Sequence, residues 1–140
     1  VEYVSWDALF SRSDVLSIHV PLTDMSSGWV TEKELKLMKK TAFLINTSRG
    51  PIVNESALID ALGKGEIAGA GLDVYDVEPL PVSHPFFKLE NVLLTPHLGY
   101  NTGATLKRFY EASVENIQAW IDGSPINILN KEVLDHRRSL

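Results

Sequence analysis

Short apolar runs alternate with helical patterns along most of the chain. Four runs have the length and composition of buried strands: residues 14–20, 42–46, 67–74 and 91–95. Helical spacing predicts helices over residues 5–10, from Thr31 onward, and from Asn54 to Gly65. Thr31 and Glu34 together predict a capping box, and Asn54 is a suitable N-cap. Strands that alternate with short helices are typical of βαβ units, so the pattern predicts an α/β fold with a parallel sheet and flanking helices.

The last helix has a different pattern. It begins at a Thr102 cap, repeats apolar residues at three- and four-residue steps, and ends at Asp122-Gly123. This apolar face is wider than a helix covering a small sheet needs, so we expect it to pack on a further domain. The tail, residues 130–140, has mixed charge and no periodicity, and we expect it to be loose.

Composition narrows the class of protein. The 140 residues are 44% hydrophobic and 22% charged, with a net charge of −5, which excludes a disordered chain and disfavours a nucleic-acid partner. There is no cysteine, so disulfides, thiolate nucleophiles and cysteine zinc sites are excluded. No long apolar run or signal peptide is visible, and we therefore expect a cytoplasmic protein without a membrane partner. The chain starts abruptly at Val1, as a processed terminus or a cut through a larger protein would.

Ionisable residues follow the predicted strands. Because parallel α/β sheets bind ligands beyond the carboxyl ends of their strands, we expect Arg49, Asp73, Glu78 and His97 to converge at one edge. An arginine can bind a carboxylate with two hydrogen bonds, and a His–Glu pair makes an oriented proton donor. Taken singly, Arg49 could be a solvated or capping residue, and Glu78 an ordinary turn residue.

Other signals carry less weight. The glycines from Gly63 to Gly71 never form the GxGxxG pattern and lie between a helix and a strand, the reverse of a phosphate loop. His84 and His136 lack partners at metal-ligand spacing, so we predict that both lie at the surface and that the chain has no metal site.

Several sequence blocks together are similar to one family. The blocks are HVPLT at 19–23, INTSRGPIVNESAL at 45–58, AGLDVYDVEPLP at 70–81, HPFF at 84–87 and NVLLTPHLG at 91–99. They resemble the D-isomer-specific 2-hydroxyacid dehydrogenases, which include D-lactate, glyoxylate/hydroxypyruvate and phosphoglycerate dehydrogenases. The resemblance implies an oxidoreductase that transfers a hydride between NAD or NADP and a small 2-oxo or 2-hydroxy acid, with a glyoxylate- or hydroxypyruvate-type substrate. The alternative within the family is a corepressor-like protein that senses the cofactor without turnover.

The resemblance also implies roles for single residues. Arg49, Glu78 and His97 match the catalytic positions: Arg49 and His97 would bind the substrate, and His97, paired with Glu78, would donate the proton. Asp73 matches the residue that holds the nicotinamide carboxamide. Pro21, Thr47, Ser48 and Gly99 match positions that line the nicotinamide half of the cofactor. Arg49 and His97 would also contact the cofactor.

The stretch of sequence lacks two segments of the family pattern. The Gly-rich phosphate loop, with its first βαβ unit, and the N-terminal substrate-binding domain are absent from this stretch, which implies a partial Rossmann-like sheet. Residues 1–101 would then be the C-terminal part of the dinucleotide-binding domain, and residues 102–140 a helix and tail that pack on the substrate domain. We expect such a fragment to be inactive alone and the whole protein to be a homodimer. Tyr100 stands where the family often has Ser or Ala, and its ring would reshape the substrate pocket.

Overall fold

The computed structural model describes residues 1–136. These belong to two compact units, of which the first is Val1–Gly99 and the second begins at Tyr100. The α-helices of the first unit are α1 (Trp6–Arg12), α2 (Glu32–Leu37) and α3 (Glu55–Gly63). Its strands are β1 (Val15–Ile18), β2 (Phe43–Asn46), β3 (Gly69–Leu72) and β4 (Val92–Leu94). Two short 3-10 helices, η1 (Gly50–Ile52) and η2 (Pro85–Lys88), complete it.

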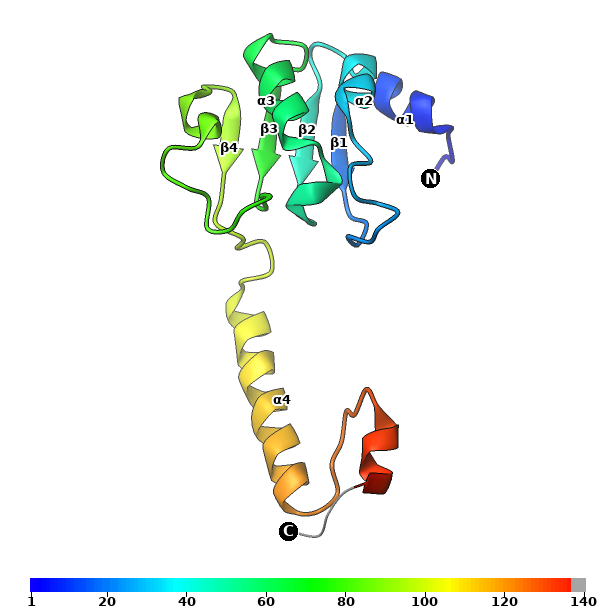
Figure 1. The fold of residues 1–140 in the computed structure, drawn as a ribbon, viewed down its shortest axis with the longest axis vertical. Helices are drawn as coiled ribbons and strands as arrows, with labels where there is room; N and C mark the ends of the chain where they lie inside the picture. Colours follow the sequence, from blue (N-terminus) through cyan, green and yellow to red (C-terminus); the bar gives the residue numbers. More distant parts are fainter. Residues whose placement is uncertain (137–140) are drawn as a thin grey trace. The chain divides into compact units, whose positions relative to one another are not determined.

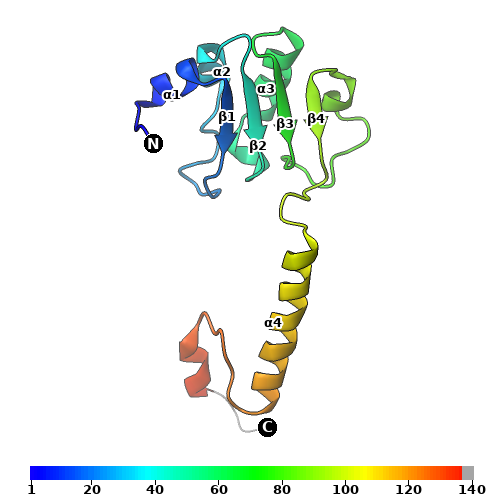
Figure 2. The ribbon, with the colours of Figure 1, turned by 180° about the vertical axis from the view of Figure 1, so that it is seen from behind.

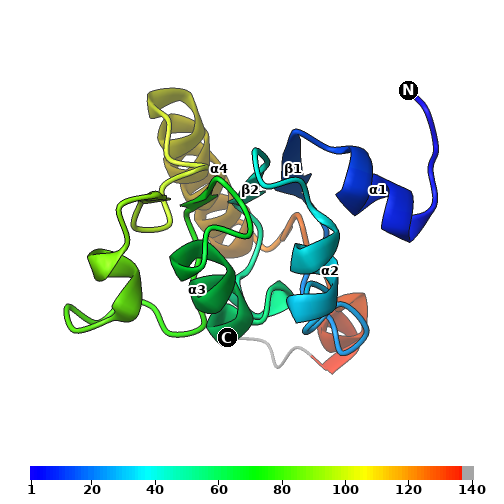
Figure 3. The ribbon, with the colours of Figure 1, turned by 90° about the horizontal axis from the view of Figure 1, so that it is seen from above.

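The strands form one parallel sheet in the order β1-β2-β3-β4 (Figure 1). Parallel strands need crossover connections, and these are almost always right-handed. Because each crossover moves to the next strand in the same direction, the connecting helices lie on the same face. Seen from above, α2 and α3 lie side by side on that face (Figure 3). The predicted α/β fold with a parallel, Rossmann-like sheet is confirmed.

The hydrophobic core lies between this face and the helices. It contains fully buried side chains from both layers: Phe10, Leu35, Leu44, Ile52, Leu58 and Ile67. The opposite face carries no helix from residues 1–99 (Figure 2). There, Val15 is 61% exposed, Phe43 46% and Leu93 71%. The alternation of buried and exposed positions along β1 follows directly from this one-sided covering.

The helix caps agree with the sequence prediction. Thr31 and Glu34 form the complete capping box of α2, and the Asn54 side chain accepts from the Ala57 N–H at the start of α3. Glu34 is buried, and its carboxylate also accepts from the Trp6 indole of α1 at 3.3 Å. This acid therefore joins two helices as well as capping one.

The strands are shorter than predicted. The segment expected as residues 14–20 pairs only over Val15–Ile18, and the one expected as 67–74 only over Gly69–Leu72. The residues beyond these limits are outside the strand register, because β2 between the two strands offers only Phe43–Asn46 as a partner. An apolar run in the sequence indicates that the residues are buried, and buried residues continue past the strand ends into the loops.

The second unit contains α4 (Gly103–Ile121), which begins at the predicted Thr102 cap. Its apolar side chains are exposed within the unit, including Phe109, Val114 and Ile117. A 3-10 helix, η3 (Lys131–His136), follows in the tail, where the sequence showed no pattern. Short 3-10 turns need only local hydrogen bonds and no apolar periodicity. Residues 137–140 of the predicted tail, and the side chain of His136, lie outside the described part of the chain.

None of the helices within residues 1–136 combines the length and the apolar character that a membrane crossing requires.

Candidate active site

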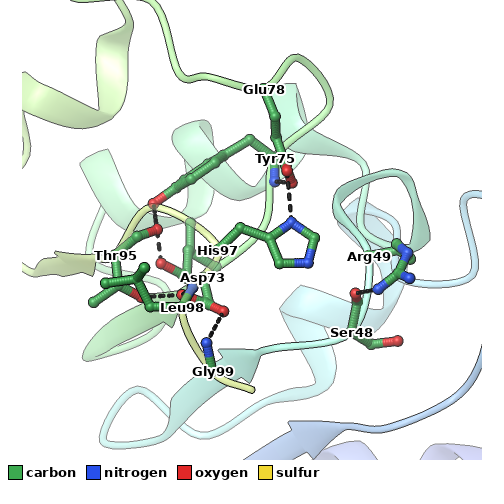
Figure 4. Close-up of polar contacts among 10 residues, drawn as sticks. Ser48, Arg49, Asp73, Tyr75, Glu78, Thr95, His97, Leu98 and Gly99 are labelled. Carbon is green, nitrogen blue, oxygen red and sulfur yellow. Dashed lines mark hydrogen bonds and ion pairs between the residues drawn. The ribbon is translucent and has the colours of Figure 1, made fainter. Parts of the chain in front are cut away.

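The predicted catalytic residues lie in loops that follow three adjacent strands. Arg49 follows β2, Glu78 follows β3 and His97 follows β4, all at the carboxyl edge of the sheet (Figure 4). His97 Nδ1 lies 2.6 Å from Glu78 Oε2. A carboxylate can only accept, so Nδ1 carries the proton and Nε2 is the ring atom that can serve a substrate. The ring projects toward the side of the site on which Arg49 lies (Figure 4).

Glu78 is held in place by two donors. Its Oε2 accepts from His97, and its Oε1 accepts from the Tyr75 backbone N–H at 3.0 Å. Burial acts to raise the pKa of Glu78, but these hydrogen bonds and the nearby charges of His97 and Arg49 outweigh it and hold the pKa below its usual value. Glu78 is therefore ionised at neutral pH and can orient and stabilise a protonated imidazole.

His97 has a backbone conformation that is uncommon for residues other than glycine. Its φ is 56°, in the left-handed region where few residues other than glycine lie. The loop after His97 folds back over β3, because the N–H groups of Leu98 and Gly99 both donate to Asp73, each at 2.8 Å. Asp73 therefore stabilises the turn that presents the His97 ring.

Asp73 is buried and receives a third hydrogen bond, from the Thr95 hydroxyl. Burial acts to raise the pKa of Asp73, but the donors from Thr95, Leu98 and Gly99, with the charge of His97, outweigh it and lower the pKa. The family resemblance gave Asp73 a role in holding the cofactor. The structure shows that it also organises the loop carrying His97.

We predict that Asp73→Asn destabilises the protein by about 1–3 kcal/mol at pH 7. The NH₂ group of asparagine would face at least one of the N–H and O–H groups that now donate to the carboxylate, and two donors that face each other leave a hydrogen bond unmade. The folded pKa lies below the unfolded one, so the carboxylate stabilises the fold fully above its unfolded pKa and loses this effect as pH falls through the folded pKa. Urea unfolding at pH 7 and pH 3 should therefore show a gap between wild type and variant that narrows in acid. Asp24→Asn, at an exposed acid, is the control. A gap that is equal at both pH values would contradict the prediction.

Arg49 is exposed and stands on a loop stabilised by the buried Asn46. The Asn46 side chain accepts from the Ser48 N–H and donates to the Arg49 carbonyl at 2.9 Å. The guanidinium donates to the Ser48 carbonyl at 2.7 Å. Within residues 1–136 no acid forms an ion pair with Arg49, so its charge is available to an anionic ligand.

Gly50 brings the Arg49 loop against the Glu78 loop. A Cβ atom at Gly50 would lie 2.1 Å from the carbonyl carbon of Tyr75 and 2.6 Å from the Asp76 nitrogen. Only glycine permits this approach of two backbones. Tyr75 is itself fixed, because its single hydroxyl proton is shared between the carbonyls of Thr95, at 2.8 Å, and Leu72, at 3.0 Å.

The residues expected to bind the cofactor leave room beside Asp73. A Cβ atom at Gly99 would lie 3.0 Å from Asp73 Oδ2 and 4.0 Å from the Thr47 Cβ, so glycine keeps this space open. Asp73 Oδ2 accepts a single described hydrogen bond and has capacity for a second, as an amide would supply. The Ser48 hydroxyl donates to the Val20 carbonyl, which joins the loop of Ser48 to the one containing Pro21. These features fit a nicotinamide carboxamide.

A cavity of about 520 Å³ adjoins the His97–Glu78 pair. Most of its lining is apolar: Tyr75, Glu78, Pro79, Leu80, Phe87, Leu94, Thr95, Pro96 and His97. Arg49 is not part of it, so this cavity is distinct from the region between Arg49 and His97.

Sequence reasoning missed several supporting residues and misplaced one. Asn46, Tyr75 and Thr95 were not singled out. The contacts between Tyr75 and Thr95 and between Thr95 and Asp73 join separate loops, whereas Asn46 acts within its own loop and its side-chain role has no apolar pattern. His84, predicted as a surface residue, has a side chain that is only 14% exposed and lies 3.0 Å from Glu55. Its partner is 29 residues away in sequence, a distance that spacing rules for metal ligands do not cover. No group of three potential metal-ligating side chains occurs among the described residues.

Comparison with known proteins agrees with this geometry. Residues 1–99 match the family model described as D-isomer specific 2-hydroxyacid dehydrogenase, NAD binding domain. The chain is 46% identical to the glyoxylate reductase of Thermofilum pendens over 138 residues, 98% of this chain and 41% of that protein. It is 38% identical to the hydroxypyruvate reductase of Blautia hydrogenotrophica, over 92% of this chain and 40% of that protein.

Solved structures show the same relationship. The fold matches the D-lactate dehydrogenase of Aquifex aeolicus, crystallised with NAD and lactic acid, with a TM-score of 0.78 and 34% identity over 88% of this chain and 41% of that one. The chain thus spans about two-fifths of the length of these relatives. It belongs to the D-isomer specific 2-hydroxyacid dehydrogenase family, and its residues 1–99 match the NAD-binding domain of that family.

Proposed function

We propose that this chain carries the catalytic residues of an NAD- or NADP-dependent 2-hydroxyacid dehydrogenase acting on a small 2-oxo acid of the glyoxylate or hydroxypyruvate type. The observation that carries the proposal is the His97–Glu78 pair, with Arg49 in the loop after the neighbouring strand and, within residues 1–136, in no ion pair with an acid. Relatives named glyoxylate reductase and hydroxypyruvate reductase support the substrate class.

Each residue has a distinct task in this proposal. Arg49 binds the substrate carboxylate, and bidentate geometry orients the adjacent carbonyl. The cofactor, when bound, supplies the hydride that reduces this carbonyl. His97 Nε2 donates the proton that the carbonyl oxygen needs, while Glu78 holds the ring at Nδ1 and stabilises its charge. Asp73 maintains the His97 turn and offers an acceptor to the cofactor amide.

The remaining expectations belong to the same proposal. Residues 1–101 contribute the second part of a dinucleotide-binding domain, and residues 102–140 pack through α4 on a substrate domain. In the whole protein we propose a homodimer, located in the cytoplasm, without a nucleic-acid or membrane partner. Tyr100 would take part in selecting the substrate.

The test is an assay of the full-length protein for NADH- and NADPH-dependent reduction of glyoxylate, hydroxypyruvate and larger 2-oxo acids. We expect turnover of at least one of them, and Arg49→Gln should raise KM for the 2-oxo acid at least about tenfold, because a charge-assisted carboxylate contact is worth roughly 1.5–3 kcal/mol. KM for the reduced cofactor should change much less. Tight cofactor binding without turnover of any 2-oxo acid would overturn the proposal and favour a sensor.

A further inference from the structure

A second histidine–carboxylate pair lies beside the catalytic one and has no part in the proposed chemistry. Glu55, the first residue of α3, lies 3.0 Å from His84 Nε2, and both side chains are mostly buried, at 21% and 14% exposure. Neither residue lines the cavity beside His97. Their closeness and burial require an explanation other than surface solvation.

The hydrogen bonds of His84 define its orientation. Its Nδ1 accepts from the Phe86 N–H at 3.3 Å, so in the neutral ring Nε2 carries the proton and donates it to Glu55. The same interaction caps η2, which begins at Pro85. His84 is therefore fixed at both ring nitrogens.

The second carboxylate oxygen of Glu55 contacts the other end of the loop that runs from Asp76 to His84. Oε2 accepts from the Asp76 backbone N–H at 3.3 Å, while Oε1 accepts a hydrogen bond from His84 Nε2. One carboxylate thus holds residues 76 and 84, and the segment between them contains Glu78. Fixing both ends of a short loop removes most of the conformations that would carry Glu78 away from His97.

We propose that Glu55 and His84 are positioning residues, which hold the loop bearing Glu78 so that its carboxylate reaches His97 Nδ1. The Glu55 contact lies two residues before Glu78, and the Gly50 backbone meets this segment from the opposite loop at Tyr75 and Asp76. The effect on catalysis rests on the proposed function, whereas the effect on Glu78 does not.

Electrostatics is consistent with this arrangement. Burial raises the pKa of Asp76, and the Glu55 charge raises it further, while His84 lowers it. The Asp76 and Glu55 carboxylates are therefore close enough for their charges to interact at one end of the loop.

The test compares Glu55→Ala, His84→Ala and the double variant in the full-length protein, with Glu90→Gln, at an exposed acid after η2, as the control. We expect each single change to lower kcat about 10- to 100-fold, as a misplacement of about 1 Å can, with KM for the reduced cofactor within about twofold. The double variant should be no worse than the singles, because each removes the same connection. Glu55→Gln, which keeps one acceptor oxygen, should lie between Glu55→Ala and wild type.

A second readout does not depend on turnover. Carboxyl ¹³C NMR should show the pKa of Glu78 moving up toward its ordinary value in Glu55→Ala, because its hydrogen bonds to His97 and Tyr75 are less populated. Glu90→Gln should leave the Glu78 titration unchanged. If Glu55→Ala does not fold, the same titration is measured in Glu55→Gln. A Glu78 titration identical to wild type in a folded variant would overturn the inference, even in an active enzyme. A shifted titration in a protein without turnover would support the inference and contradict the proposed function.

Discussion

Replacing His97 with asparagine in the full-length protein should lower kcat for 2-oxo acid reduction by about 100- to 10,000-fold, the usual contribution of a positioned acid–base group. Asparagine can still donate to Glu78 Oε2, so the loop should remain in place, but it has no proton to transfer to the substrate oxygen. Affinity for the reduced cofactor, measured by fluorescence titration, should change by less than about threefold.

The comparison with Glu78→Gln makes the assignment specific. That variant keeps the His97 ring and loses the charge that stabilises its protonated form, so it should retain more activity than His97→Asn. The two changes combined should be no worse than His97→Asn alone, because the residues act as a unit. If His97→Asn leaves turnover within a few-fold of wild type, then the proton donor is another group and the role given to His97 is wrong.

Gly50→Ala should be the most destabilising substitution among the loops of the site. The new methyl carbon would overlap the Tyr75 backbone, 2.1 Å from its carbonyl carbon and 2.2 Å from its oxygen, so the two loops must separate. Forced overpacking costs about 1–3 kcal/mol and occasionally more. We expect a loss near or above the upper end of that range, since backbone and not a flexible side chain must move. Thermal and urea unfolding measure it.

The same substitution should also reduce activity in the molecules that remain folded. Separation of the loops would increase the distance between Arg49 and the Glu78–His97 pair, so kcat/KM for the 2-oxo acid should fall at least about tenfold. Gly63→Ala is the matched control, because its Cβ would meet only Leu89 Cδ2 at 4.0 Å and alanine favours the helix. Equal stabilities of Gly50→Ala and Gly63→Ala would show that the close approach at Gly50 is not required.

The elements of the fold were readable from the chain because their signals are local. The Thr31–Glu34 capping box, the Asn54 cap and the Thr102 cap each involve neighbours within one turn, and all three occur as predicted. The residues at which β1 and β3 end could not be predicted from the sequence, because the length of β2, which lies between them, decides how many of their residues pair. The short helix η3 lacked an apolar period and was missed for that reason.

By itself, the sequence determined the strand–helix order, the family, and the identity of the residues that follow each strand, since these depend on composition and spacing along the chain. Only the tertiary structure decided that the Glu78 carboxylate meets His97 Nδ1 at 2.6 Å, and that Gly50 lies against Tyr75. It also decided that His84, expected at the surface, binds Glu55 at the base of the Glu78 loop. These contacts join residues 19 to 29 positions apart through packing of separate loops, and no local pattern in a chain encodes a distance of that kind.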